Sequence, residues 1–385
     1  MKTLFKRCVV SIVLFAVGGL PPLASAAWIQ EVVDNSRDVG FASQIGFHGD
    51  FHVVYFDNTN HVLKYAHQAS GTPWTVENIG PGGHASLALD ANGAPHIAFT
   101  VQSAGGTAVA HAVRTGPGQW ATVTVDQGPS ISDTSIAIGP NGAIHVAYRF
   151  GSQLKYAVNS PGTPGFASML VDGGAPLNKN TGVTPSIAVD STGRPSIAYG
   201  SYTDHALMFA QWNGAKWVLD TADAYSNVGS YISLSMANGR PNVAYFGKNG
   251  LQFQTWVSGP GDWIRNPTFG ETVDTAGTQL GVSIVLDGAG VQHIAYPAMV
   301  NLPAGGASAE LRYATRTGAN AWVHETVDVP GIADPSLALD AGGVPHISYG
   351  SAVPGSQPLF VLKVATVVSN NRIIHTGPKP VFRDN

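Results

Sequence analysis

Polar and aromatic side chains suited to holding a sugar gather between residues 149 and 231. They include two cations, two amides, a carboxylate, an imidazole and three phenols: Arg149, Lys179, Asn180, Tyr202, Asp204, His205, Tyr225, Asn227 and Tyr231. Tyrosine rings stack on pyranose faces, while amides and carboxylates satisfy sugar hydroxyls at modest desolvation cost. Arg149 or Lys179 could pair with the charged group of a uronate or a sulfated sugar. We therefore predict that these nine residues bind a carbohydrate.

An enzymatic interpretation of the same region also exists. A lyase needs a base for the C5 proton of a uronate, a neutraliser for its carboxylate and an acid, roles open to His205 or Tyr202 with Arg149 and Tyr225. A glycoside hydrolase needs two opposed carboxylates, for which Asp204 and Asp223 are the nearest candidates. Neither set has a spacing that demands the chemistry. Binding is therefore our first hypothesis, a polysaccharide lyase or hydrolase the second, and a structural or protein-interaction role the third.

Five recurring histidines could suggest a metal site. They are His52, His96, His145, His293 and His346. Each occupies the same slot of a repeated unit, so symmetry spreads them over the molecule and keeps them from converging on one ion. We interpret them as internal hydrogen-bonding groups, each paired with a neighbouring backbone group, and we predict no metal and no cofactor. Recurring aspartates are interpreted as turn formers: Asp90, Asp190, Asp287 and Asp340.

The repeated unit is best seen at Ser86–Phe99, SLALDANGAPHIAF, with a worn first copy at Ser43–Tyr55. The histidine slot recurs every 44 to 53 residues, at His52, His96, His145, Ser196, Asn242, His293 and His346. Seven copies at this spacing predict a single repeat architecture. The fourth and fifth copies replace the histidine, with Ser196 and Asn242.

Each unit contains four segments with the residue pattern of short strands. We name them A (SLALD type), B (PHIAY type), C (LKYA type) and D (Trp…Val-Asp type). The A–B and C–D links are tight turns, such as Asp90–Gly93 and Asn213–Gly214. The B–C and D–A links vary in length and lie at the opposite end of each unit. Because function usually resides in such uneven loops, the nine candidate residues are placed on that face.

A D-type segment, Trp28–Asp34, precedes the first A segment, and none follows the last C segment. We expect Trp28–Asp34 to pair with the C strand near 359–365 and to close the ring, which hides two strand edges. The sequence therefore predicts an all-β fold, a seven-bladed β-propeller of four-stranded antiparallel blades closed by the N-terminal strand. The propeller is assigned to residues 27–368 and a C-terminal tail to residues 369–385.

The units Ser-x-Ala-x-Asp…Gly-x-Pro-His-Ile-Ala-Tyr, with Leu-Lys-Tyr-Ala and Trp-x-x-Glu-Thr-Val-Asp, resemble the repeats of secreted bacterial propellers. They are distantly similar to Asp-box propellers, which include sialidases, lectins and polysaccharide lyases. The resemblance covers residues 27–365 and implies a fold rather than an activity. Here the turn is Asp-x-x-Gly followed by Pro-His, whereas an Asp-box has Asp-x-Gly followed by an aromatic residue. The arginines are scattered and do not form the triad with which sialidases bind a carboxylate.

Residues 1–26 have the pattern of a secretory signal peptide: Lys2, Lys6 and Arg7, an apolar run, then Ala24-Ser25-Ala26. Cleavage after Ala26 leaves 17 Lys and Arg against 24 Asp and Glu, so the net charge changes from −4 to −7. The only cysteine, Cys8, lies in the leader. This acidic, sparsely charged chain argues against nucleic-acid partners and membrane insertion. We predict a monomeric protein, extracellular or periplasmic, with a glycan ligand.

Overall fold

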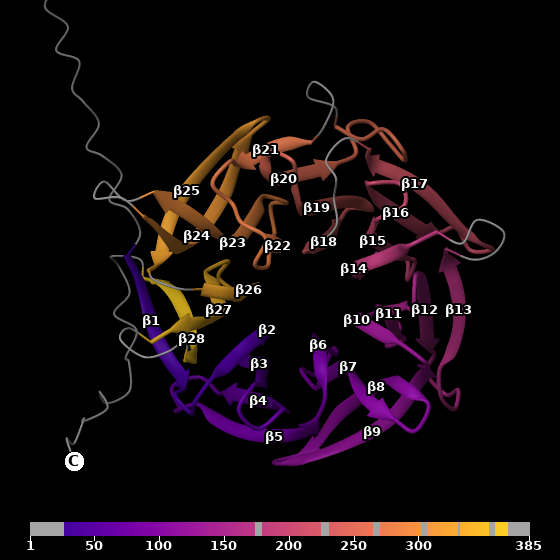
Figure 1. Ribbon diagram of the computed structural model, residues 1–385, viewed down its shortest axis with the longest axis horizontal. Helices are drawn as coiled ribbons and strands as arrows, with labels where there is room; N and C mark the ends of the chain where they lie inside the picture. The colour runs from indigo at the N-terminus through magenta and orange to yellow at the C-terminus, as the bar shows by residue number, and fades with distance from the viewer. Residues whose placement is uncertain are drawn as a thin grey trace, which may run out of the picture.

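The computed structural model describes residues 27–173, 179–224, 231–264, 270–301, 306–329, 332–353 and 359–368. The predicted signal peptide and C-terminal tail lie outside these ranges. The described residues form seven four-stranded antiparallel sheets arranged as blades around one axis (Figure 1). The prediction of an all-β seven-bladed propeller is confirmed. No helix of this described part is long and apolar enough to cross a membrane.

The A strands line the centre of the ring and the D strands form its rim (Figure 1). The A strands are β2 (Val39–His48), β6 (Gly83–Leu89), β10 (Ile131–Ile138), β14 (Thr181–Val189), β18 (Ile232–Ala237), β22 (Ser283–Leu286) and β26 (Ile332–Leu339). The B strands are β3 (Asp50–Asp57), β7 (Pro95–Ser103), β11 (Ile144–Phe150), β15 (Pro195–Ser201), β19 (Arg240–Gly247), β23 (Gln292–Asn301) and β27 (Pro345–Ala352).

The outer half of each blade completes the sheet. The C strands are β4 (Val62–Gln68), β8 (Gly106–Gly116), β12 (Gln153–Asn159), β16 (Ala206–Trp212), β20 (Gly250–Thr255), β24 (Ala307–Gly318) and β28 (Phe360–Val368). The D strands are β5 (Thr75–Pro81), β9 (Gln119–Gly128), β13 (Ala167–Asp172), β17 (Trp217–Asp223), β21 (Glu271–Asp274), β25 (Ala321–Asp328) and β1 (Ala27–Asp34). Blade 1 is β2–β5, and blades 2 to 7 follow in chain order.

Ring closure occurs in blade 7, where β1 from the N-terminal end pairs with β28. The pairing is antiparallel, with Ala27 opposite Val368 and Asp34 opposite Leu362. In Figure 1 the indigo β1 lies beside the yellow β28. Trp28 packs edge-on against Tyr313 of blade 6, and its indole N–H donates to Glu325 at 2.9 Å. Blade 7 is thereby joined to blade 6 by the opposite end of the chain.

The core is distributed between the blades. Each of seven clusters of buried apolar residues joins one pair of neighbouring blades, such as Ala198 of blade 4 with Leu234 of blade 5. Strand B is buried on both faces, and every residue of β15 is buried. This burial on both faces places the B strands between neighbouring sheets.

The recurring serine of strand A links each blade to the next. Its hydroxyl accepts the backbone N–H of the residue one position later in the next A strand, as Leu234 N–H donates to Ser186 Oγ at 2.9 Å. Six junctions share this bond, at 2.9–3.2 Å, through Ser86, Ser135, Ser186, Ser233, Ser283 and Ser336. The seventh slot holds Gln44, which faces Val54 as Ser86 faces Ala98. The alignment of Ser43 with these serines was wrong, because the hairpin of blade 1 turns at the single residue Gly49.

A second junction forms where the aspartate ending a D strand meets the next blade. Tyr148 of β11 and Lys155 of β12 both bond to Asp126 of β9, at 2.5 and 2.9 Å. Tyrosine donors occur at six junctions, to Asp34, Asp126, Asp172, Asp223, Asp274 and Asp328. At the junction of blades 1 and 2 the corresponding residues are Gly80, Phe99 and Ala110. The carboxylate and both of its donors are thus replaced together, which indicates that they act as one structural unit.

The recurring histidines bond within their own blades. His52 and His145 pair through Nδ1 with Tyr65 and Tyr156 of strand C, at 2.5 and 2.6 Å. His293 likewise pairs with Tyr313, His96 with His111 at 2.9 Å and His346 with Thr366 at 2.8 Å. The prediction of an internal bond is confirmed, but the predicted backbone partner was wrong. The hydroxyl or imidazole comes from strand C, directly opposite the histidine in blade 7 and two residues before the opposite position in the other four blades.

The recurring aspartates form the expected turns. Asp90 Oδ1, for example, accepts the backbone N–H groups of Asn92 and Ala94, each at 2.8 Å. Asp190, Asp287 and Asp340 repeat this geometry. These turns fix the ends of the A and B strands opposite the variable loops.

Candidate functional site

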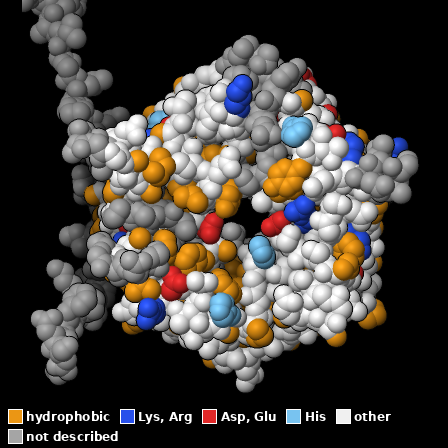
Figure 2. Space-filling view, in the orientation of Figure 1, with side chains coloured by type: hydrophobic (Ala, Val, Ile, Leu, Met, Phe, Trp, Pro, Cys, Tyr) orange, Lys and Arg blue, Asp and Glu red, His pale blue; other side chains and the backbone are white. Residues whose placement is uncertain are grey.

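A pocket of about 220 Å³ lies on the axis of the ring, where the A strands begin. The D–A and B–C links surround this end, so the pocket opens on the loop-bearing face. Figure 2 shows this face hollowed at its centre, with acidic, histidine and basic side chains near the edge of the hollow. The strands of all seven blades contribute to the lining. We call it the central pocket.

One backbone position recurs around the pocket, two residues before the serine slot. Its occupants are Ala42, His84, Asp133, Thr184, Tyr231, Gly281 and Asp334. All seven have a positive φ, between 40° and 57° for the six that are not glycine and 108° for Gly281. In five blades the A–B register shifts at this point, which marks a β-bulge. Such bulges redirect a side chain out of the regular sheet alternation.

Because glycine is the residue that best tolerates a positive φ, the larger side chains at this position need an explanation. A non-glycine residue in this region costs of the order of 1–3 kcal/mol of backbone strain, and β-branched or bulky residues are the least tolerated. Blade 6 shows that glycine fits the position, yet blades 4 and 5 carry Thr184 and Tyr231. Strained residues of this kind cluster at ligand sites, where a side chain is held in place for use.

The lining is acidic. Burial raises the pKa of Asp334 above its ordinary value, although the backbone N–H of Ala42, 3.1 Å from Oδ2, opposes the shift. Burial and the nearby carboxylates of Asp334 and Asp133 also raise the pKa of Tyr231. His84 Nδ1 lies 3.6 Å from Asp133 Oδ1. No lysine or arginine from the described part of the chain lines the pocket.

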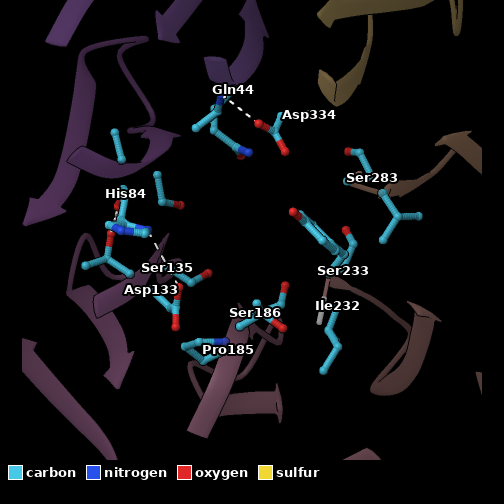
Figure 3. Close-up of a pocket in the computed structure, with 18 of the residues that line it drawn as sticks. Gln44, His84, Asp133, Ser135, Pro185, Ser186, Ile232, Ser233, Ser283 and Asp334 are labelled. Carbon is cyan, nitrogen blue, oxygen red and sulfur yellow. Dashed lines mark hydrogen bonds and ion pairs between the residues drawn. The ribbon is translucent and has the colours of Figure 1, made fainter. Parts of the chain in front are cut away.

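Gln44 adds an amide to this lining. Figure 3 shows it among the side chains that surround the pocket, between Asp334 of blade 7 and His84 of blade 2. Its serine counterparts accept backbone N–H groups of the next blade, whereas Gln44 makes no side-chain hydrogen bond within the described residues. The amide is therefore available to a ligand.

The predicted residues of blades 3 and 4 form a separate group, which we call the loop cluster: Arg149, Lys179, Asn180, Tyr202, Asp204 and His205. Arg149 donates to Asn180 Oδ1 at 2.8 Å, and its guanidinium lies over the Tyr202 ring, 5.9 Å from the centroid. Lys179 forms an ion pair with Asp204 at 2.8 Å. Tyr202 is 46% exposed. The structure thus brings these side chains together, but they satisfy much of one another's charge.

The other predicted residues are distributed differently. Tyr231 lines the central pocket. Tyr225 and Asn227 lie outside the described residues. Asp223, suggested with Asp204 as a catalytic pair, is 1% exposed and accepts the Tyr245 hydroxyl at 2.6 Å. Asp223 is therefore a junction residue, and the suggested pair does not face one site.

Sequence reasoning missed His84, Asp133, Asp334 and Gln44. The signal was present, since each lies at or two residues before the slot of a recurring serine. The seven positions hold six different residue types, with only aspartate used twice, so the position looked like unpatterned loop. The described part of the chain contains no group of three or more His, Cys, Asp or Glu residues arranged to hold a metal ion.

Comparison with known proteins identifies the fold. No protein-family model and no curated protein matches the sequence. A protein of unknown function from Dyadobacter fermentans superposes with a TM-score of 0.51 at 10% identity, covering 74% of this chain and 95% of that one. The intramolecular trans-sialidase from Ruminococcus gnavus gives 0.50 at 12% identity, covering 78% and 96%. The predicted distant likeness to sialidase-type propellers is confirmed for the fold, which is all that such identities show.

Proposed function

We propose that this protein is a carbohydrate-binding propeller that holds one ligand in the central pocket. The observation that carries the proposal is the contrast between backbone and side chains there. One strained backbone position recurs in seven blades, but its occupants differ in size, charge and hydrogen-bonding capacity. A repeated lectin site would carry the same residues in each blade, whereas this lining favours a single asymmetric site.

The lining also suggests the kind of sugar. Two carboxylates, an imidazole, an amide and several hydroxyls offer partners for sugar hydroxyls, and Tyr231 offers an aromatic face. With carboxylates present and no lysine or arginine in the described lining, an anionic sugar would be repelled. We therefore propose a neutral glycan for this pocket, with the loop cluster contributing at its rim. The trans-sialidase is a sugar-processing protein with a related fold, but the proposal rests on the pocket's own residues.

A glycoside hydrolase is the second candidate. Asp334 is held toward its protonated form by burial, whereas Asp133 lies beside the imidazole of His84. A carboxyl group with a raised pKa and a second carboxyl group are the usual acid and base of glycoside hydrolysis. We rank binding first because no side chain of the described residues is hydrogen-bonded to both carboxyl groups.

Secretion belongs to the same proposal. Residues 1–26 have the signal-peptide pattern, and a protein exported to the periplasm or the medium would meet polysaccharides there. N-terminal sequencing of the protein recovered from cell fractions tests this step. We expect the mature chain to begin at Ala27.

Affinity electrophoresis of residues 27–385 through gels containing neutral polysaccharides tests the function. We expect retention by at least one of glucan, mannan, xylan or galactan, and loss of that retention in Asp133→Asn. Retention by none of them, or retention that Asp133→Asn leaves unchanged, would overturn the central pocket as the site. New reducing ends that disappear in both Asp133→Asn and Asp334→Asn would instead identify a hydrolase.

A further inference from the structure

A second cleft, of about 600 Å³, lies between blades 5 and 6. Its lining comes from A–B turns and C–D links, including Asn238, Arg240, Trp256 and Gly290, so it opens opposite the central pocket. We call it the blade 5–6 cleft. Neither the nine predicted residues nor the proposed function involves it.

Several departures from the repeat converge on this cleft. In blades 2, 6 and 7 the turn aspartate lies 3.6–3.9 Å from the recurring histidine, as Asp287 does from His293. Blade 5 has neither, because Asn242 replaces the histidine and a two-residue turn, Asn238–Gly239, replaces the aspartate turn. Both turn residues have positive φ, 50° and 73°, as this tight hairpin requires. The substitutions remove an imidazole and a carboxylate and leave open space.

Blade 6 contributes a further departure. Gln292 occupies the slot that holds proline in blades 2, 4, 5 and 7. Its side-chain amide donates to Asn242 Oδ1 at 3.0 Å, so the replacements in the two blades contact each other. Gln292 Oε1 makes no bond within the described chain. The cleft wall thus presents amide groups where the repeat has proline and histidine.

The charge of the cleft is positive. Arg316 pairs with Glu271 through two hydrogen bonds of 2.6 and 3.0 Å. Among the described residues Arg240 has no carboxylate partner. Its Nη2 donates to the carbonyls of Trp256 and Val257, and its Nε and Nη1 make no bond to that part of the chain. One positive charge therefore remains in a protein of net charge −4. A guanidinium with free donors recognises carboxylate and sulfate groups.

We infer that the blade 5–6 cleft is a second binding site, which takes an anionic sugar bearing a carboxylate or sulfate group. Arg240 receives the anion, and Asn242, Gln292 and Asn238 bond to the ring hydroxyls. The two faces of the propeller thus select sugars of different charge. This site is independent of the central pocket, since it lies at the other end of the blades.

Two matched pairs of polymers test the inference. Polygalacturonate is compared with its methyl ester, and dextran sulfate with dextran, by affinity electrophoresis at low and high salt. We expect salt-sensitive retention by at least one anionic member and weaker or no retention by its neutral partner. The member retained identifies carboxylate or sulfate as the preferred anion. Equal retention by both members of each pair, or by neither member, would overturn the inference.

Variants that restore the repeat provide the decisive control. The double substitution Asn242→His and Gln292→Pro fills the cleft with residues that other blades carry at the same slots. The new histidine would have a partner, because Thr255 lies opposite residue 242 as Thr366 lies opposite His346. We expect retention by the anionic polymer to weaken at least about tenfold, which corresponds to about 1.4 kcal/mol. Arg240→Gln should act likewise, whereas Ser196→His, the same restoration in blade 4, and Asp133→Asn should have no effect. Loss in Asp133→Asn but not in Arg240→Gln would assign the anion to the central pocket and contradict the inference.

Discussion

His84 is a non-glycine residue at a backbone position whose positive φ favours glycine. Its φ is 46° and its side chain is 58% exposed, so packing contributes little to holding it there. Glycine at this position would remove the strain, as Gly281 does in blade 6. Retention of a strained, exposed imidazole in the wall of a pocket is best explained by contact with a ligand.

His84→Gly is therefore expected to weaken glycan binding while leaving the protein equally or slightly more stable. The released strain, of the order of 1 kcal/mol, offsets the flexibility that glycine adds to the unfolded chain. Urea unfolding and affinity electrophoresis of the same preparation check both expectations. A destabilised protein that still binds normally would show that His84 is structural.

Ser186 shows the opposite kind of residue, one used for assembly. Ser186→Ala leaves the N–H of Leu234 without its acceptor at the junction of blades 4 and 5. An unsatisfied buried donor costs about 1–3 kcal/mol, and we expect a loss of that size in the free energy of unfolding. Ser152→Ala is the control, because that side chain is exposed and makes no hydrogen bond within the described chain. Equal effects of both substitutions would contradict the role of the recurring A-strand serines in joining neighbouring blades.

At the scale of elements, the features that could be predicted from the sequence are those that recur with the same residues in several blades. The strand order, the aspartate turns and the internal bonds of the histidines follow from positions that recur with the same residues. The sites could not be predicted in the same way. The pocket is built around one backbone position whose occupants vary from blade to blade, with only aspartate used twice. Gln44 was hidden because the single-residue turn at Gly49 shifts the alignment. The identity of the histidine partners depends on the register of strands B and C.

The paired B and C strands make stability sensitive to pH. Burial lowers the pKa of His52, His111 and His145 to about 4, whereas the same groups in the unfolded chain titrate near 6.5. Between these values the unfolded state binds more protons than the folded one, so the free energy of unfolding falls as the pH decreases from 6.5 to 4. Each unit of pKa shift corresponds to about 1.4 kcal/mol.

Urea unfolding at pH 7 and pH 5 measures this dependence. We expect a clear loss of stability at pH 5, and a smaller loss in His145→Asn, since asparagine occupies this slot in blade 5 and does not titrate. An equal loss in the wild type and the variant would show that buried histidine does not cause the pH dependence.

At the scale of the whole molecule, closure of the ring depends on the pairing of β1 with β28. The β1 strand completes blade 7 and also supplies Asp34, which accepts the Tyr55 hydroxyl of blade 1 at 2.6 Å and pairs with Lys64 at 3.1 Å. Without β1, strand β28 is left as an open edge and the junction of blades 7 and 1 loses its carboxylate.

Deletion of Ala27–Asp34 is accordingly expected to yield aggregated or unfolded protein. Size-exclusion chromatography with circular dichroism checks this result, and Ile29→Lys, on the exposed side of β1, serves as the control that should remain folded. A soluble truncated protein with unchanged thermal stability would contradict closure by the N-terminal strand.

Gln44 has two roles, because it interrupts the ring of serine hydrogen bonds between the A strands and it lines the central pocket. Gln44→Ser should complete the ring by accepting the Leu87 N–H, and it should stabilise the fold by about 0.5–1.5 kcal/mol. The same substitution removes an amide from the pocket. The most direct measurement is isothermal titration of the retained neutral glycan into wild-type protein and Gln44→Ser, each accompanied by a thermal melt. We predict a higher melting temperature and a weaker affinity for the variant. An unchanged affinity in a more stable variant would contradict the central pocket as the ligand site.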